Sequence, residues 1–586
     1  MVRVVPDIPA VHRWFDYVVP DALDPEVRLG SRVRIDLHGR RVGGWVVEDR
    51  VTPPAGVTPR AVALSSGEGP PASVVDLAVW ASWRWAGPVS SFLGTASPDR
   101  VVRRPAVPAR PHPRTVTSPG GASVGLVATA LDRGSSTVLR LAPALDANLP
   151  ALELVHRVGP DGVLALAPSH ARAVHLADRL RRAGAPVALL PDGWAAAAGG
   201  GRVVVGTRAA AWAPIGRMRA AVVLDAHDES YREERSPTWS AVEVVAERCR
   251  RDGAPLVLVT PCPTVALLEG SALAVTDRTV ERRGWPAVEV VDRTGDDPRT
   301  GLFSERLVTL LHSVLDRPEG RVVCILNRTG RARLLACAHC GAVARCTRCG
   351  GSVGQPEVGG ELRCGRCGSG RPAICAECDS SRLKLLRMGV SRATEELSAL
   401  VGVEAVEVSG GAPGTPEGVG ARLVVGTEAA LHRVGRADAV AFLDVDQHLL
   451  APRFGAGEES LGLLARAARL VGGREAGGRL LVQTRIPDHE VLQAAVHGDP
   501  ARLTDPERAL RRELGLPPFG ALALLRGAAA ESYAGALRAV DTVSVSSPSA
   551  DRWLVRADDH PRLCDALAAT PRPSGRLRVE VDPTDV

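Results

Sequence analysis

The segment Arg202-Val-Val-Val-Gly-Thr-Arg-Ala-Ala210 decides the fold class, because it recurs almost unchanged as Arg422-Leu-Val-Val-Gly-Thr-Glu-Ala-Ala430. Each copy is followed, after a similar interval, by an apolar run that ends in an acid, Asp225 in the first case and Asp444 in the second. Short apolar runs of this kind, separated by helical stretches, are typical of buried parallel strands. The matched interval favours a true duplication over chance recurrence in a chain rich in Val and Gly. The sequence therefore predicts two α/β lobes.

The composition is that of a folded protein with several domains. At roughly 150 residues per domain, a chain of 586 residues holds about three to five domains. A hydrophobic content of 45% and a charged content of 24% exclude the disordered and fibrous classes. No apolar stretch approaches the ~18 residues of a membrane helix, which excludes a transmembrane role and a membrane partner. The first residues form no charged-then-apolar leader, so we expect a cytoplasmic location.

The basic residues are almost all Arg, and this bears on nucleotide binding. The net charge of +6 is mild for the length and does not by itself identify a nucleic-acid-binding protein. Lys384 is the only Lys in the chain, and the residues around it contain no glycine-rich loop. A P-loop needs Gly-x-x-x-x-Gly-Lys-[Ser/Thr], in which the ammonium group contacts the β- and γ-phosphates. A standard Walker-A site is therefore absent, which puts ATP and Mg²⁺ in doubt as cofactors.

Eight of the twelve cysteines form four C-x-x-C pairs within one short, Gly-containing stretch. Two tetrahedral four-thiolate zinc sites need four such pairs, each giving two thiolates from a tight turn. A disulfide framework suits small secreted domains, and a redox C-x-x-C is usually solitary, so we expect two Zn²⁺ ions per chain. The spacing alone leaves the pairing open. A nested pairing fits a hairpin-like insertion and assigns Cys337, Cys340, Cys375 and Cys378 to one zinc, and Cys346, Cys349, Cys364 and Cys367 to the other. The isolated cysteines are expected to be buried small hydrophobes: Cys249, Cys262, Cys324 and Cys564.

The segments outside the lobes are simpler. Residues 1–65 alternate short strands with Gly and Pro turns and predict a small β-domain. Trp80 and Trp83 share one face of a predicted helix and are expected in the core rather than on a base-stacking platform. Residues 98–119 hold six Pro and several Arg and predict a stiff linker. A helix over 505–514 precedes a final small α+β segment.

The order of these parts resembles the PriA family of bacterial primosomal replication-restart proteins, and the likeness covers nearly the whole chain. The most specific matches, besides the spacing of the eight cysteines, are Trp14-Phe15-Asp16-Tyr17, Val223 to Tyr231, Leu326-Asn327-Arg328, and Arg511-Arg512-Glu513-Leu514 with Pro517-Pro518-Phe519. The family is a superfamily-2, 3′-to-5′ DNA helicase. The resemblance implies an α/β multidomain fold with a small N-terminal β-domain, two RecA-like helicase lobes, a two-zinc insertion in the second lobe and a C-terminal α+β domain.

The resemblance also implies the domain boundaries. The expected parts are an N-terminal 3′-end DNA-binding domain (1–97), a Pro-rich linker (98–120), a first helicase-like lobe (121–295), the start of a second lobe (296–336), a zinc-binding insertion (337–380), the rest of the second lobe (381–515) and a C-terminal domain (516–586). Members usually carry a winged helix before the first lobe. The Pro-rich linker is too short to hold one, so that DNA contact is expected to be missing.

The sequence departs from the family's pattern at the nucleotide site. The family's phosphate loop falls on Leu141-Ala-Pro-Ala-Leu-Asp-Ala-Asn148, which has neither Gly nor Lys, and its Asp-Glu-Glu-His aligns with Leu224-Asp225-Ala226-His227. Leu224 thus replaces the Mg²⁺ ligand, and Ala226 replaces the residue that orients the attacking water. The family's Gly-Arg-Ala-Gly-Arg aligns with Arg469-Leu-Val-Gly-Gly473, so both arginines expected at the γ-phosphate are lost. Hydrolysis depends on these groups for positioning and charge stabilisation. We therefore expect a scaffold without ATP-driven unwinding, in which Asp225 and His227 are structural.

In the family, the N-terminal domain holds the 3′ end of the leading strand at a fork. The residues that match its pocket are Phe15, Asp16, Tyr17, Gly39 and Arg60. An aromatic ring can stack on the last base, a carboxylate can accept a hydrogen bond from the 3′-hydroxyl, Gly permits close backbone approach, and a cation suits phosphate. Spacing alone favours a strand with Phe15 or Tyr17 in the core, whereas the resemblance favours the pocket.

These features predict a non-catalytic, PriA-like protein that recognises abandoned or stalled replication forks and promotes primosome assembly and helicase reloading. The expected partner is forked or single-stranded DNA with a 3′ end, and the resemblance adds single-strand-binding protein and helicase-loading proteins. The alternative is a divergent ATP-dependent 3′-to-5′ DNA helicase, which the missing Lys and the replacements at 224, 226, 470 and 473 disfavour. A zinc-organised scaffold that no longer binds DNA is disfavoured by the retained Phe15-Asp16-Tyr17.

Overall fold

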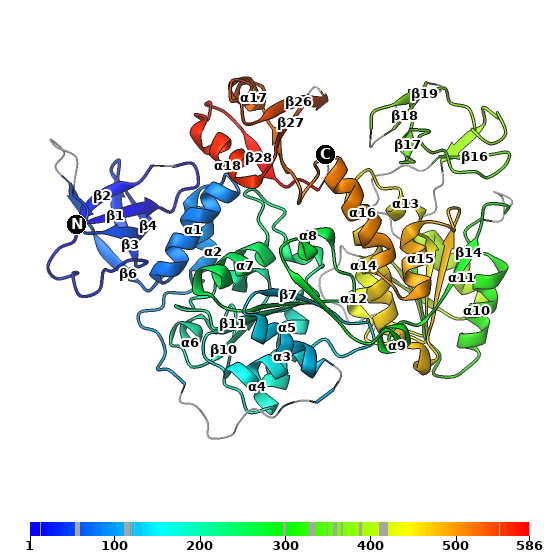
Figure 1. The fold of residues 1–586 in the computed structure, drawn as a ribbon, viewed down its shortest axis with the longest axis horizontal. Helices are drawn as coiled ribbons and strands as arrows, with labels where there is room; N and C mark the ends of the chain where they lie inside the picture. Colours follow the sequence, from blue (N-terminus) through cyan, green and yellow to red (C-terminus); the bar gives the residue numbers. More distant parts are fainter. Residues whose placement is uncertain are drawn as a thin grey trace.

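The structure is a computed structural model with several α/β and β parts arranged side by side (Figure 1). It describes residues 1–11, 13–52, 59–109, 118, 120–121, 123–296, 301–326, 335–348, 350–355, 360–364, 367–385, 390–409, 420–549 and 551–584. In Figure 1 the N-terminal sheet lies at the left, the first lobe below the centre, the second lobe at the right and the C-terminal domain at the top. The predicted mixed α/β, multidomain class is confirmed.

The N-terminal sheet closes into a small barrel. Its strand order is β5-β2-β1-β4-β3-β6, with bounds β1 (Val2–Pro6), β2 (Phe15–Val18), β3 (Arg32–Leu37), β4 (Arg40–Asp49), β5 (Arg60–Ala61) and β6 (Leu64–Gly67). Closure occurs between β5 and β6, where Val62 N–H donates to Val18 O and Ala63 N–H donates to Arg34 O, both at 2.9 Å. Two consecutive residues thereby bond to β2 on one side and to β3 on the other, which joins the two ends of the sheet.

Helices α1 (Ala72–Arg84) and α2 (Val89–Ala96) connect this barrel to the first lobe. A row of aromatic rings crosses the junction, with centroid separations of 6.3 Å from Trp85 to Phe92 and 5.5 Å from Phe92 to Trp212. Trp80 packs edge-on against Trp85 at 5.3 Å, and Trp83 Nε1 donates to Asp565 of the C-terminal domain at 2.8 Å. Trp80 is thus half-buried against the core, whereas Trp83 lies outside the core clusters of the described residues and contacts the C-terminal domain, so the expectation that both lie in the core is wrong for Trp83.

The two lobes share one strand order. The first sheet is β13-β7-β12-β11-β8-β10-β9 and the second is β14-β24-β23-β15-β22-β21, and neighbouring strands in both are parallel. The first lobe has β7 (Ser136–Arg140), β8 (Val163–Leu166), β9 (Val187–Leu189), β10 (Val203–Gly206), β11 (Ala220–Leu224), β12 (Leu256–Thr260) and β13 (Ala272–Val275). The second has β14 (Ala287–Asp292), β15 (Val322–Leu326), β21 (Ala405–Val408), β22 (Leu423–Gly426), β23 (Ala439–Asp444) and β24 (Arg479–Thr484). The repeated Val-Val-Gly strands, β10 and β22, hold the same place in the two orders, which supports the duplication.

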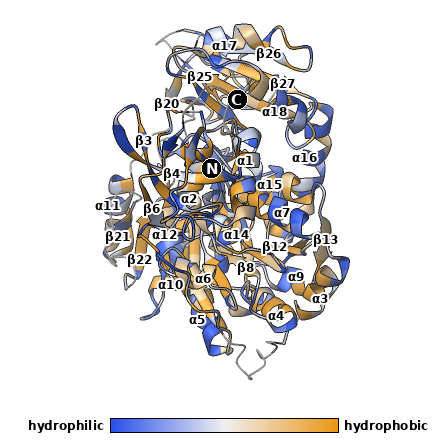
Figure 2. Ribbon diagram, turned by 90° about the vertical axis from the view of Figure 1, so that its left-hand side faces the viewer, coloured by the Kyte–Doolittle hydropathy of each residue, from blue (hydrophilic) through white to orange (hydrophobic). Residues whose placement is uncertain are grey.

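Helices cover the faces of both sheets. In Figure 2 many of them carry both hydrophobic and hydrophilic residues, as elements that cover a buried sheet should. Those used below are α4 (Leu149–Val158), α5 (His170–Arg182), α7 (Ala241–Asp252), α8 (Val265–Leu268), α14 (Ala456–Val471) and α16 (Ala501–Glu513), the last of which confirms the predicted C-terminal helix. Among the described residues no helix has the length and apolarity to span a bilayer.

Two further parts complete the chain. The Cys-rich segment follows β15 and contains β16 (Leu335–Cys337), β17 (Val353–Gly354), β18 (Leu362–Cys364), β19 (Gly370–Arg371) and β20 (Leu383–Leu385). The C-terminal domain has α17 (Ala530–Leu537), α18 (His560–Ala569) and a sheet of order β26-β27-β25-β28, from β25 (Ala521–Arg526), β26 (Ser544–Ser549), β27 (Arg552–Ala557) and β28 (Arg578–Val581).

The part of the Pro-rich segment that the structure describes runs along the first lobe. Ala106 N–H donates to Ala195 O at 2.9 Å, and Ala109 N–H donates to Gly200 O at 3.2 Å. Gly201 permits this approach, because a Cβ there would lie 2.3 Å from Ala109 O. The linker up to residue 109 is thus fixed by backbone contacts, and most of the remainder (110–117 and 119) lies outside the described residues.

Candidate DNA-end site, metal centres and interlobe cleft

Strand β2 carries the predicted DNA-end residues on opposite faces. Tyr17 is buried inside the barrel, and its hydroxyl donates to Asp36 O at 3.1 Å. Phe15 is half-buried and packs against the same interior cluster. Asp16 lies between them on the strand and therefore faces the opposite side, away from the barrel interior. The structure therefore places Asp16 and Tyr17 on opposite faces of β2 and does not bring them together in one pocket.

The Asp16 carboxylate forms an ion pair across the strands. Arg3 of β1 stands directly opposite it and donates from Nε to Oδ1 at 2.8 Å and from Nη2 to Oδ2 at 3.3 Å. The same guanidinium donates to Glu48 of β4 at 2.7 Å. Asp16 is thus held by a cation on the barrel surface, and a hydroxyl that bound to it would share the carboxylate with Arg3.

Tyr17, Arg60 and the turn at Gly39 lie at one edge of the barrel. Arg60 is exposed and pairs with Tyr17 in the β2–β5 register. Burial raises the pKa of Tyr17, and the nearby charge of Arg60 partly opposes this rise. Gly39 follows Asp36 in the β3–β4 turn with φ of 78°, and nothing lies within 4 Å of the position that a Cβ would take. Tyr17 thus links the strand that carries Arg60 to the strand that leads into the Gly39 turn.

Trp14 is a candidate that the sequence reasoning did not select. Its side chain is 39% exposed, and it is the one aromatic residue among the exposed large hydrophobic side chains of the described chain. It immediately precedes Phe15, and an exposed ring beside a basic surface is suited to base stacking. The nearby exposed cations Arg34, Arg40 and Arg41 form no ion pair within the part of the chain that the structure describes. The sequence could have indicated that Trp14 is exposed, because Trp14 stands just before a predicted strand and not inside a periodic apolar pattern.

The cysteine sulfurs fall into two groups that follow the nested pairing. Cys337, Cys340, Cys375 and Cys378 form one, and Cys346, Cys364 and Cys367 form the other; Cys349 lies outside the described residues. The Sγ–Sγ distances are 3.6 Å for Cys337–Cys378 and for Cys340–Cys375, and 3.5 Å for Cys346–Cys367. Four sulfurs placed tetrahedrally at the Zn–S distance of about 2.3 Å lie about 3.8 Å apart, so both groups could hold a zinc ion.

The turns of these groups also suit thiolates. Backbone N–H groups donate to sulfur at 3.3 Å (His339 to Cys337), 3.4 Å (Arg348 to Cys346) and 3.4 Å (Glu377 to Cys375). Such bonds favour the charged form of the thiol and fix its direction. The isolated cysteines are all buried, as predicted.

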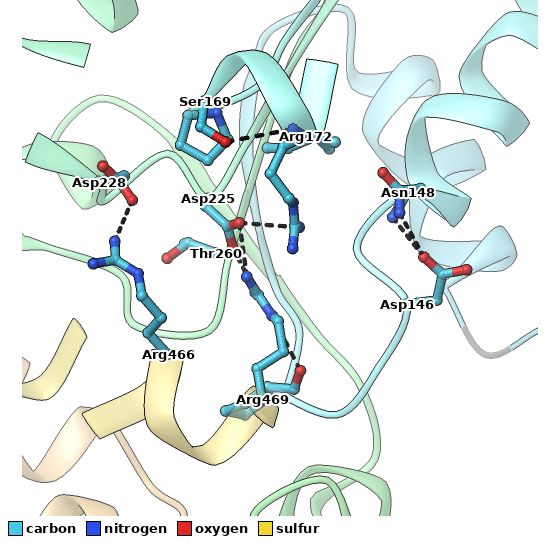
Figure 3. Close-up of polar contacts among 12 residues, drawn as sticks. Asp146, Asn148, Ser169, Arg172, Asp225, Asp228, Thr260, Arg466 and Arg469 are labelled. Atoms are coloured by element: carbon cyan, nitrogen blue, oxygen red, sulfur yellow. Dashed lines mark hydrogen bonds and ion pairs between the residues drawn. The ribbon is translucent and has the colours of Figure 1, made fainter. Parts of the chain in front are cut away.

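The contact between the lobes is centred on Asp225, directly after β11 (Figure 3). Its carboxylate accepts two hydrogen bonds from Arg469 of α14, Nη2 to Oδ1 at 2.6 Å and Nη1 to Oδ2 at 2.8 Å. Arg172 of α5 donates a third, from Nη2 to Oδ2 at 3.2 Å. Burial alone would raise the pKa of Asp225, but the two guanidinium groups hold it well below its usual range. Asp225 is therefore a carboxylate whose charge is balanced by the chain's own arginines.

The residues expected to align with a nucleotide site make other contacts here. Leu224 and Ala226 are buried and apolar, so neither can ligate Mg²⁺. Asp146, in the segment expected to align with the phosphate loop, accepts hydrogen bonds from the backbone N–H and from Nδ2 of Asn148, both at 3.0 Å, and pairs with Arg179. A carboxylate of the chain thus lies at the start of α4, where a bound phosphate would meet like charge.

Comparison with known proteins decides the family. A probable replication restart protein PriA of Mycobacterium tuberculosis (strain CDC 1551 / Oshkosh) is 30% identical over 589 residues, covering 89% of this chain and 86% of its own. The corresponding protein of Mycobacterium leprae (strain TN) is 30% identical over 583 residues with the same coverage. This chain belongs to the PriA family.

Two further comparisons show which parts of the chain match other PriA proteins. The family model of the PriA 3′ DNA-binding domain matches residues 3–98, which contain the barrel, α1 and α2. The replication restart protein PriA of Bacillus subtilis (strain 168) is 28% identical over 347 residues, which is 55% of this chain and 43% of that protein. The chain therefore spans most of the mycobacterial PriA proteins but less than half of the Bacillus protein.

Proposed function

We propose that this PriA-family chain recognises forked DNA that carries a free 3′ end, and promotes primosome assembly and helicase reloading there without unwinding DNA itself. The observation that carries the proposal is the matched 3′ DNA-binding domain, retained with an exposed cationic barrel surface in a chain of which 89% aligns with its mycobacterial relatives. Stalled or abandoned forks are the DNA structures that present such an end.

The DNA end is recognised, in this proposal, on the outer face of β2, where Asp16 lies. Asp16 accepts a hydrogen bond from the 3′-hydroxyl and shares its carboxylate between this hydroxyl and Arg3. Tyr17 supports the strand from inside the barrel, half-buried Phe15 is the ring next to Asp16, and the backbone at Gly39 admits the sugar. Arg60 adds a phosphate contact, and such contacts position the strand without reading its sequence.

Zinc is the metal that the two cysteine groups favour, because four thiolates at tetrahedral distances suit it best. Bound metal would supply the folding energy of the Cys-rich segment, which has only short strands of its own. We propose two ions per chain, with Cys349 completing the second set. The segment then forms a rigid surface beside the second lobe.

The absence of a motor follows, in this proposal, from the chemistry of the cleft. Hydrolysis of a nucleoside triphosphate needs groups that neutralise its phosphates, hold Mg²⁺ and position water. The matching positions hold apolar Leu224 and Ala226, and Asp225 already accepts hydrogen bonds from Arg172 and Arg469. Single-strand-binding protein and helicase-loading proteins are the partners proposed from the family resemblance, and the cytoplasm is the proposed location.

A comparison of two variants tests the DNA-end assignment. Asp16→Ala and Glu48→Ala each remove one carboxylate partner of Arg3, but only Asp16 is assigned to the 3′-hydroxyl. Binding would be measured at fixed salt on forks whose leading strand ends in a 3′-hydroxyl or in a 3′-phosphate. We expect Asp16→Ala to lose the preference for the hydroxyl end by roughly 10- to 100-fold, the value of one hydrogen bond to a charged group, and Glu48→Ala to keep it. Equal loss on both ends, or no loss, would refute the pocket.

A further inference from the structure

We infer that the ion pair between Asp225 and Arg469 holds the two lobes permanently in one closed arrangement, in the place where a nucleotide would otherwise join them. This goes beyond the loss of hydrolysis, because a chain that has lost hydrolysis could still open and close its lobes on nucleotide binding. The two residues belong to different lobes, since Asp225 follows β11 and Arg469 lies on α14. They face each other across the cleft in Figure 3.

The geometry is that of a strong pair. Both oxygens of Asp225 accept one N–H each from Arg469, at 2.6 and 2.8 Å, which is the parallel two-bond arrangement that gives arginine its specificity for carboxylates. Asp225 is buried, with 4% of its surface exposed. Removing Arg469 from the closed arrangement would therefore leave a buried carboxylate with the longer contact to Arg172, at 3.2 Å.

The same guanidinium reaches a second part of the first lobe. Arg469 Nε donates to Pro143 O at 3.4 Å, in the segment expected to align with the phosphate loop. One side chain of the second lobe thus contacts both the residue after β11 and the loop after β7. In a nucleotide-binding site those two places would face Mg²⁺ and the phosphates. Here the Arg469 guanidinium supplies the positive charge beside Asp225.

A second ion pair lies beside the first. Arg466, one turn before Arg469 on α14, pairs with Asp228, which is bonded through its N–H to Asp225 O at 2.8 Å. Arg466 Nη1 also lies 2.8 Å from Nε2 of His432 in the second lobe. Arg466 and Arg469 lie on the same face of α14, because residues at i and i+3 are neighbours on a helix. This one face therefore forms ion pairs with both Asp228 and Asp225.

Further contacts join the two lobes beside this ion pair. A Cβ on Gly462 of α14 would lie 2.9 Å from Cδ2 of His227, so helix and loop are in direct contact. Cys262 Sγ lies 3.6 Å from Leu461 O, and the backbone N–H of Val265 donates to Glu458 Oε1 at 2.6 Å. Ala142 and Cys262 of the first lobe share an apolar cluster with the second lobe. The closed arrangement thus rests on packing as well as on charge.

The test uses the full chain and two substitutions on the second lobe. Arg469→Leu removes the ion pair and keeps an apolar side chain, whereas Arg474→Leu alters an exposed arginine nearby. Hydrogen exchange of the amides of α14 and α8 would report local opening of the interface. We expect Arg469→Leu to speed this exchange by roughly 100-fold, the effect of breaking a buried pair, and Arg474→Leu to leave it unchanged. Equal exchange in the two variants would overturn the inference.

A second measurement needs no variant and decides the matter if Arg469→Leu does not fold. Small-angle X-ray scattering of the unaltered chain would be recorded with and without ATP and Mg²⁺. The inference predicts the same radius of gyration in both, because no nucleotide is needed to close the lobes. A change on adding ATP and Mg²⁺ would overturn it. Neither measurement contains DNA, so a failure of fork recognition would be seen separately.

Discussion

Arg84, at the end of α1, joins three parts of the molecule, and its substitution should release the C-terminal domain. Its Nη2 donates to Glu243 of α7 and to Asp582 after β28, both at 2.7 Å. Its backbone O accepts from Cys564 Sγ of α18 at 3.3 Å. The substitution Arg84→Met keeps much of the apolar bulk and removes both ion pairs.

The free-energy cost of Arg84→Met follows from the solvent exposure of the two acidic side chains. The Glu243 side chain is 42% exposed, so its pair contributes less than about 1 kcal/mol. The Asp582 side chain is 16% exposed, and in the Arg84→Met variant its carboxylate would keep His560, at 2.7 Å, as its ion-pair partner. Burial alone would raise the pKa of Asp582, but Arg84 and His560 hold it well below its usual range. Removal of one member of such a buried pair costs about 3 kcal/mol, which corresponds to a roughly 100-fold change in a local opening equilibrium.

Hydrogen exchange of the α18 amides in the full chain measures that opening. The control is Arg562→Met on the same helix, whose pair with Asp558 is exposed, 51% for Arg562 and 86% for Asp558. We expect Arg84→Met to speed exchange in α18 roughly 100-fold and Arg562→Met to change it less than about threefold. Similar rates in the two variants would refute the reasoning, because they would show that Arg84 does not fix the domain.

Three further predictions concern metal, DNA and pH. Elemental analysis should find about two zinc ions per chain, and Cys364→Ser should lower this to about one; a metal-free purified protein would contradict the cysteine assignment. Trp14→Ala should weaken binding to DNA with a single-stranded 3′ end by roughly 5- to 100-fold at fixed salt, which is the contribution of one stacked base. Val18→Ala, which alters another exposed residue of the barrel, should leave the affinity unchanged. Equal affinities of the two variants would show that Trp14 does not contact the DNA. Burial, only partly offset by Asp225 and Asp228, lowers the pKa of His227 to about 4 in the folded chain. The pKa of His in the unfolded chain is about 6.5, so neutral His227 contributes fully to stability above that pH. This contribution is lost as the pH falls from about 6.5 towards 4, because the unfolded chain then binds a proton that the folded chain does not. The difference in melting temperature between the unaltered chain and His227→Asn should therefore shrink towards acid pH, and a constant difference would show that His227 is not held neutral.

The sequence predicted those features of the fold that repeat or that have a fixed spacing. The duplicated Val-Val-Gly strands lie at equivalent places in two sheets of the same order, because a buried parallel strand leaves a continuous apolar run in the sequence. The cysteine groups follow the nested pairing, because each C-x-x-C turn fixes two sulfurs locally. Closure of the N-terminal barrel was not foreseen, since it depends on two backbone hydrogen bonds from Val62 and Ala63 rather than on side-chain pattern.

The candidate site was predicted less completely. The sequence marked Asp225 as structural, but its partner Arg469 lies far along the chain, and no local pattern links a residue after β11 with one on α14. The opposite directions of Asp16 and Tyr17 follow from their adjacency on one strand, which the sequence did show. The ion pair between Asp16 and Arg3 required the register of β1 against β2, which only the fold supplies.

The central claim is that this PriA-family chain binds forks through a 3′ end and has no nucleotide-driven motor. The most direct test measures ATP hydrolysis on a fork with a leading-strand 3′ end and records binding to the same fork at the same salt concentration. We expect fork binding that requires the free 3′ end, with no hydrolysis stimulated by DNA. Clear DNA-stimulated turnover would contradict it, because that result would require a nucleotide site in a cleft where Arg469 already occupies Asp225.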